Sequence, residues 1–87
     1  MSIQCHDLKI KPEYFNAIAS GDKTFEVRYN DRGYKVHDTL RLREHDNGEY
    51  TGREITAEVT YLLDDTGYCK EGYVIMAIKT ITTNLTI

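Results

Sequence analysis

Alternation of apolar and polar residues is the feature that most limits how this chain can fold. Residues 24–29, 39–45 and 53–63 carry apolar side chains at every second position, which is the period of a strand with one buried face. Residues 6–10 and 73–78 add two further strands, and the second is apolar on both faces, as in the centre of a sheet. The alternation predicts these inward-facing residues: Phe25, Val27, Tyr29, Leu40, Leu42, Ile55, Ala57, Val59 and Tyr61.

A single segment departs from this period. From Pro12 to Ser20 the apolar residues recur at helical spacing, which places Tyr14 among the core residues. Pro12 suits the first turn of a helix, and Gly21 is a typical C-terminal stop. Turns are expected at residues 30–33 and 46–48, where Asn-Gly tolerates a positive φ, and residues 64–72 form a loop.

The fold class predicted from these elements is mainly β (α+β), in a single domain over residues 1–87. A chain of 87 residues is too short for two packed sheets with helices on both faces. We therefore expect a small mixed, mostly antiparallel barrel, half-closed or closed, with one N-terminal helix at about 12–20. Whether residues 80–87 extend the last strand or form a dimer contact is left open.

Charge and composition exclude several classes of protein. The formal balance is −3, from 11 basic and 14 acidic residues, so the chain as a whole is not a basic nucleic-acid binder. It has no apolar run long enough to cross a bilayer and no signal-peptide pattern, which predicts a cytoplasmic protein. Cys5 and Cys69 lack zinc-like spacing with the three histidines, so we expect two reduced, partly buried thiols, no metal and no cofactor.

One segment is locally positive. Residues 23–43 carry six basic side chains against three acidic ones. At its start, Lys23 follows the glycine stop, and Glu26 and Arg28 share one face of the next strand. Two cations and one carboxylate there suit a polar, partly anionic ligand, with the cations for phosphate and the carboxylate for an amino group. Charges on the outer face of a strand are usually only solvated, however, and the spacing alone favours that interpretation.

The residues Gly21, Lys23, Glu26 and Arg28 match G-x-K-x-x-E-x-R, the hallmark of ASCH (activating-signal-cointegrator homology) domains. Nearly the whole chain up to Lys79 resembles an uncharacterised ASCH-like family of small bacterial and phage proteins. The further blocks that carry the resemblance are residues 6–10, 12–15, 30–32, 36–38, 50–54 and 72–74. It implies a PUA-like β-barrel, a cleft lined by the motif, and RNA or nucleotide binding. His37 stands where such sequences usually have glycine, at a turn that can require a positive φ.

An enzyme is the first alternative. Some ASCH relatives resemble amidohydrolases that deacylate a modified nucleoside with a Lys, a Thr three residues later, and a distant Glu. Here Lys23 matches, but Glu26 occupies the threonine position, and Thr24 is adjacent to the lysine. If the protein is an enzyme, Lys23, Thr24 and Glu26 are its candidate catalytic residues. The departure at Glu26 favours a binding protein.

A binding protein has a larger set of candidate residues. Tyr34 and Tyr73 are candidates for stacking on bases. The predicted nucleic-acid surface is Lys9, Lys23, Glu26, Arg28, Asn30, Arg32, Arg43 and Tyr73, with Lys11 and Arg41 beside it. A second alternative is a phage or bacterial accessory protein whose acidic second half, residues 54–71, pairs with a basic protein partner.

Overall fold

The computed structural model describes residues 3–86 and contains one helix and one sheet of five strands. In chain order, the elements are β1 (Cys5–Ile10), α1 (Pro12–Ala19), β2 (Phe25–Tyr29), β3 (Thr39–Asp46), β4 (Glu49–Leu63) and β5 (Tyr73–Asn84). The mainly β fold with a single short helix near the N-terminus is therefore confirmed.

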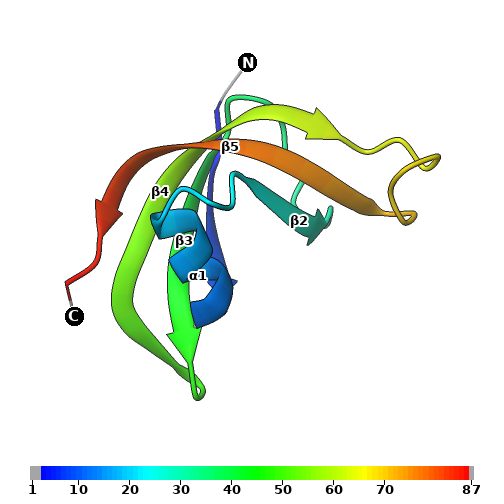
Figure 1. Cartoon of the computed structure of the whole chain (residues 1–87). Coiled ribbons are helices and arrows are strands. Elements are labelled where there is room, and N and C mark those ends of the chain that lie inside the picture. The colour runs from blue at the N-terminus through cyan, green and yellow to red at the C-terminus, as the bar shows by residue number, and fades with distance from the viewer. Residues whose placement is uncertain (1–2, 87) are drawn as a thin grey trace.

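The sheet is open and curled. Its strand order is β1-β3-β4-β5-β2, with β1 and β3 parallel and the other pairs antiparallel. The long strands β4 and β5 bend, so the sheet forms a half-barrel in which α1 lies against the concave side (Figure 1). The two edge strands, β1 and β2, are far apart in the strand order, and the candidate site lies between them.

The core fills the inside of this curl. Leu40, Leu42, Ile55, Ala57 and Val59 are fully buried, as the alternation predicts. The helix adds Phe15 and Ile18, and burying a side chain such as Phe15 contributes about 2–3 kcal/mol. Pro12 begins the helix and Gly21, at φ 85°, follows its end, so the helix signals of the sequence are confirmed.

Two turns depend on residues with a positive φ. Asn47 and Gly48, at φ 51° and 81°, connect β3 to β4 in a tight hairpin, as predicted. His37 has φ 78°, so the position where the resemblance expects glycine does require the left-handed region. Its backbone N–H donates to the Val59 carbonyl oxygen at 2.7 Å, and this bond holds the turn against β4.

The predicted orientation of β2 is wrong. Phe25, Val27 and Tyr29 are exposed, whereas Glu26 is only 4% exposed and Arg28 is partly buried. The strand therefore turns its charged face toward the inside of the curl and its apolar face outward. Alternation gives the two faces of a strand but does not say which one is buried.

Three tyrosines also differ from the prediction. Tyr61 is exposed because the pairing of β4 with β5 shifts between Val59 and Tyr61, a bulge that reverses the two faces beyond Val59. Tyr14 is exposed beside the buried Phe15. Tyr34, predicted to stack on bases, is instead buried in the core against His6, at 4.8 Å between ring centroids.

The ends of the strands extend beyond the predicted limits. β4 begins at Glu49 rather than at 53, and β5 continues to Asn84, so residues 80–84 extend the last strand. Residues 49–52 and 80–84 pair with a neighbouring strand but are mostly exposed on both faces, so alternation did not reveal them. Residue 87 lies outside the described residues.

Cys5 is exposed, which corrects the expectation of partial burial, and Cys69 is buried. Within residues 3–86, no three His, Cys, Asp or Glu side chains gather into a metal-binding group. In the same range no helix is long and apolar enough to cross a membrane.

Candidate functional site

The site is built where the helix ends and β2 begins. The carbonyl oxygen of Ala17 accepts hydrogen bonds from the backbone N–H groups of Asp22 and Lys23, at 3.0 and 2.9 Å. With Gly21 in the left-handed region, these bonds turn the chain sharply out of the helix. The turn aims the Lys23 side chain at the inner face of β2.

A buried carboxylate lies at the centre of the site. Oε1 of Glu26 accepts a hydrogen bond from Nζ of Lys23 at 2.8 Å, and Oε2 accepts one from Nε of Arg28 at 2.9 Å. The Lys23 ammonium also donates to the Phe25 carbonyl oxygen at 2.7 Å. Burial of a carboxylate is costly unless it is paired, and here each oxygen has a cationic partner.

Arginine side chains connect the two edge strands. Nη2 of Arg28 donates to the Lys9 carbonyl oxygen of β1 at 2.8 Å. Nη1 of Arg32 donates to the Asp7 carbonyl oxygen, two residues earlier on the same edge, at 3.0 Å. The gap between β1 and β2 is thus bridged by guanidinium groups rather than by a backbone ladder.

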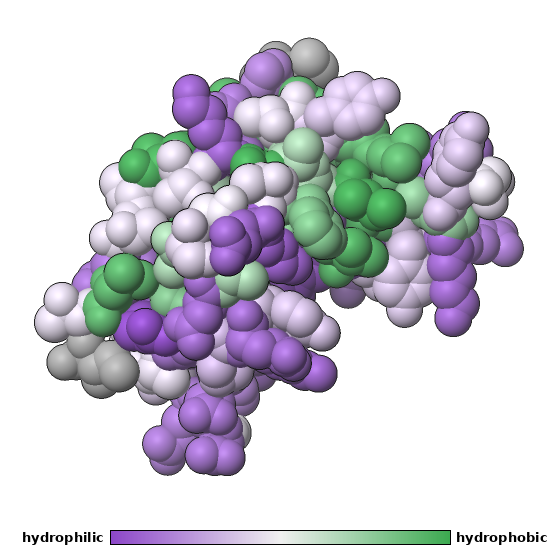
Figure 2. Space-filling model, viewed as in Figure 1, coloured by the Kyte–Doolittle hydropathy of each residue, from purple (hydrophilic) through white to green (hydrophobic). Residues whose placement is uncertain are grey.

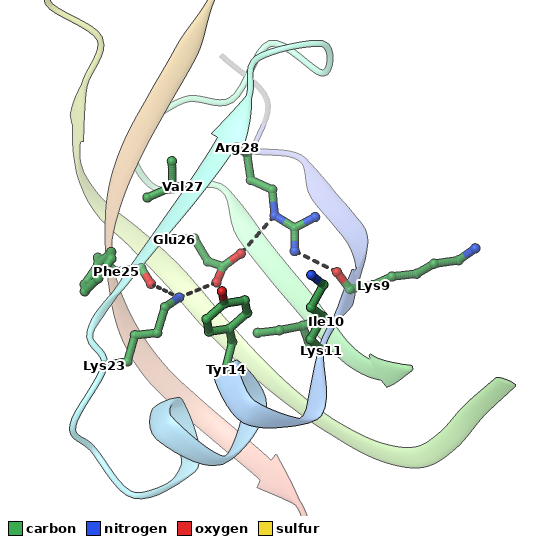
Figure 3. Close-up of a pocket in the computed structure, with 9 residues that line it drawn as sticks. All are labelled: Lys9, Ile10, Lys11, Tyr14, Lys23, Phe25, Glu26, Val27 and Arg28. Atoms are coloured by element: carbon green, nitrogen blue, oxygen red, sulfur yellow. Dashed lines mark hydrogen bonds and ion pairs between the residues drawn. The ribbon is translucent and has the colours of Figure 1, made fainter. Parts of the chain in front are cut away.

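Beside this bridge is a cavity of about 470 Å³ between β1, the start of α1 and β2. Figure 3 shows the side chains of Lys23, Glu26 and Arg28 pointing toward one another on its wall, with the Tyr14 ring beside Lys23 and Glu26. The Lys23 ammonium lies over two aromatic rings, 4.8 Å from the Phe25 centroid and 5.5 Å from that of Tyr14. The lining residues are Lys9, Ile10, Lys11, Tyr14, Lys23, Phe25, Glu26, Val27 and Arg28. We call this cavity the edge cleft.

The edge cleft favours anions. Three basic side chains, Lys11, Lys23 and Arg28, line it against one acidic side chain, although the whole chain carries −3. Lys9 contributes its backbone, since its ammonium lies toward the Tyr50 ring (Figure 3). Toward the described residues, Lys23 uses two of its three N–H donors and Arg28 two of its five. The remaining donors suit an anionic or acceptor-rich ligand.

The structure brings together only part of the predicted surface. Lys9, Lys11, Lys23, Glu26 and Arg28 line the edge cleft. The other predicted residues lie elsewhere. Asn30 and Tyr73 line a smaller hollow of about 260 Å³ beyond the C-terminal end of β2, and Arg32 lies on the β1 edge. Arg41 pairs with Glu54, and the Arg43 guanidinium lies 3.9 Å from the centroid of the Tyr50 ring.

Two predicted contributions change. Thr24, a candidate nucleophile, is exposed and is not among the residues that line the cleft. Tyr14, Phe25 and Val27 do line it, although the periodicity assigned them to the core. The sequence did offer one signal for these residues. Phe25 and Val27 lie within the G-x-K-x-x-E-x-R motif, and Tyr14 lies on the helix that precedes it.

Two other buried acids serve the fold. Hydrogen bonds from Arg53 lower the pKa of Glu44 despite its burial, with help from the Thr51 hydroxyl. Burial raises the pKa of Asp38, but hydrogen bonds with His6 and with two backbone N–H groups outweigh it and hold that pKa below its usual value. Glu44 attaches the helix to the sheet, because its partner Arg53 also donates to Asn16 of α1. Asp38 attaches the 30–38 turn to β1 through His6.

The fold and the site together define a small curled-sheet protein with a cationic cleft at the open edge of the sheet. The chain belongs to the DUF3850 family, a domain of unknown function whose model matches residues 5–78, which include the whole edge cleft. It is also similar to an uncharacterized 12.9 kDa protein in the GpA 3′ region of Escherichia phage P2. The two are 36% identical over 76 residues, which are 87% of this chain and 69% of the phage protein.

Proposed function

We propose that the protein binds RNA or a nucleotide in the edge cleft, as a member of the ASCH group with a PUA-like barrel. The observation that carries this proposal is the buried Glu26 carboxylate, which fixes Lys23 and Arg28 at the wall of a 470 Å³ cavity with donors to spare. A cavity of this size is within the range of small-molecule sites. It fits one nucleotide or one extruded base rather than a duplex.

Each part of a nucleotide has a matching group in the cleft. The Arg28 guanidinium and the Lys23 and Lys11 ammonium groups are suited to phosphate. The Tyr14 ring, which lines the cleft beside Lys23, offers a face for stacking on a base. We assign Glu26 mainly to holding the two cations, because both of its oxygens are already engaged.

The amidohydrolase alternative has less support. It needs a nucleophile beside Lys23, and Thr24 is exposed outside the cleft. We therefore propose binding rather than catalysis at this site.

Fluorescence anisotropy with short labelled RNAs tests the proposal. We expect saturable binding to single-stranded RNA that weakens with salt, with a logarithmic slope of about −2 if three cations contact phosphate. Lys11→Ala removes an exposed cleft cation and is expected to weaken binding, whereas Lys35→Ala, an exposed lysine outside the cleft, is the matched control. Absence of saturable binding to RNA and to mononucleotides, or equal losses in the two variants, would contradict the proposal.

A further inference from the structure

The outer face of the sheet carries a second surface, separate from the floor of the edge cleft. Phe25, Val27 and Tyr29 of β2 point away from Glu26 and Arg28, and Figure 3 shows this for Phe25 and Val27. The register of β2 with β5 sets them beside Ala77, Ile75 and Tyr73, respectively. The bulge in β4 then brings Tyr61 and Leu63 to the same face, opposite Ala77 and Ile75. We call these eight residues the apolar face.

The apolar face is large for an unpartnered surface. Hydrophobic side chains gather over β2 and the adjacent part of β5 in Figure 2. The exposed fractions of its aromatic residues are 44% for Phe25, 58% for Tyr29, 65% for Tyr61 and 36% for Tyr73. With about 200 Å² per aromatic residue, these fractions amount to about 400 Å² of aromatic surface alone. Val27, itself 50% exposed, adds to it, and such a patch reaches the upper range for monomers.

We infer that the apolar face is the interface of a homodimer in which two copies of the chain pack these strands face to face. Two aromatic surfaces of about 400 Å² each, extended by Val27, Ile75 and Leu63, approach the roughly 1,000 Å² that a specific interface needs. Face-to-face packing of sheets at about 10 Å is the usual way in which such surfaces are buried.

Along β5 the shape of the face is self-complementary. Along β5 its residues run from the large Tyr73 through Ile75 to the small Ala77. A two-fold axis in the interface, across the strands at Ile75, sets Tyr73 of each copy over the partner's Ala77. On the edge strand β2, the same axis places Val27 against the partner's Val27 and the Phe25 ring over the partner's Tyr29, in an isologous contact.

Charge favours a second copy over RNA. None of the eight residues is charged, and the cations nearest to the face, Lys23 over the Phe25 ring at 4.8 Å and Lys70 over the Tyr73 ring at 5.9 Å, lie at its border. Beyond Tyr61 and Ala77, the cross-strand pair of Glu58 on β4 and Lys79 on β5 has opposite signs. A neutral face with a mixed-sign border suits a copy of itself, whereas RNA suits the edge cleft.

Sedimentation equilibrium of the full chain tests this inference with two matched pairs of variants. Val27→Lys and Tyr61→Lys each place a charge on the apolar face. Their controls, Val36→Lys and Tyr68→Lys, make the same change at exposed residues outside it. Circular dichroism confirms that each variant is folded. Tyr61 does not line the edge cleft, so its variant separates dimerisation from ligand binding.

The wild type is expected to sediment at twice its chain mass of 10.1 kDa and to dissociate on dilution. Both face variants are expected to weaken association by about 100-fold or more, because each dimer buries two unpaired charges, and both controls are expected to remain dimeric. A wild type that stays monomeric at its highest soluble concentration would overturn the inference. So would dissociation of the control variants to the same extent as the face variants.

Discussion

Substitution of the buried carboxylate, Glu26→Gln, is the most informative perturbation of this fold. The amide keeps the shape of the side chain but removes the charge that Lys23 and Arg28 share. Loss of one member of a buried charge group typically costs about 3–5 kcal/mol. Since water reaches part of the ammonium and guanidinium groups, we expect the free energy of unfolding to fall by about 2–3 kcal/mol.

Urea denaturation measures this change. With a slope of about 1 kcal/mol/M for a chain of this size, the midpoint is expected to fall by about 2–3 M at an unchanged slope. The matched control is Glu54→Gln, whose partner Arg41 is more exposed than Lys23 or Arg28. We expect this control to lower the free energy of unfolding by less than about 1 kcal/mol. Equal midpoints for the two variants would refute the reasoning that Glu26 organises the cleft.

The same variant separates two roles of Glu26 in binding. If the carboxylate holds the cations in position, its removal lets both side chains move, and the affinities for inorganic phosphate and for a mononucleotide fall together in folded protein. If Glu26 accepts a hydrogen bond from the base, nucleotide affinity falls while phosphate affinity does not. Titration calorimetry with both probes measures the difference, and we predict the first outcome because both carboxylate oxygens are already paired.

Three further predictions concern the turn, the buried acids and the threonine. His37→Gly is expected to stabilise the protein by about 0.5 kcal/mol in urea denaturation, because glycine adopts φ 78° without strain. The His37 ring also lies 3.0 Å, from Nδ1 to Oε2, from the Glu58 carboxylate, and a loss of stability would show that this contact outweighs the strain. Asp38 and Glu44 have pKa values lowered in the folded state, so the stability that they contribute is complete above their ordinary values of 3.8 and 4.5 and is lost as the pH falls below them. Acid unfolding is therefore expected to be shallower in Glu44→Gln than in the wild type, and an identical pH profile would contradict this. Thr24→Ala is expected to leave the RNA affinity measured by anisotropy unchanged. A loss of affinity equal to that of Lys11→Ala would show that Thr24 contacts the ligand.

Local signals in the sequence predicted the elements well, for physical reasons. Pro12, Gly21 and Asn47-Gly48 restrict the backbone by themselves, so the helix and the hairpin turn were found at their correct places. Leu40, Leu42 and Ile55 alternate with polar residues on strands whose other face meets solvent, so their burial followed from the period.

The misassigned residues depend on long-range pairing. A bulge near Thr60, which arises only from the register with β5, exposes Tyr61. The orientation of β2 depends on an ion-paired cleft that makes the burial of Glu26 tolerable, and Phe25 and Val27 then face outward. The motif identified three charged residues of the site, but alternation could not show that a charged face would be the inner one.

The most direct test of the central claim is to locate the ligand on the protein. Amide chemical shifts of labelled protein, recorded during titration with a mononucleotide and with a short single-stranded RNA, report where each one binds. Binding in the edge cleft predicts that the perturbed amides fall within residues 9–14 and 23–28, which contain all of its lining residues. Saturable perturbations confined to other segments, or none with either ligand, would contradict it.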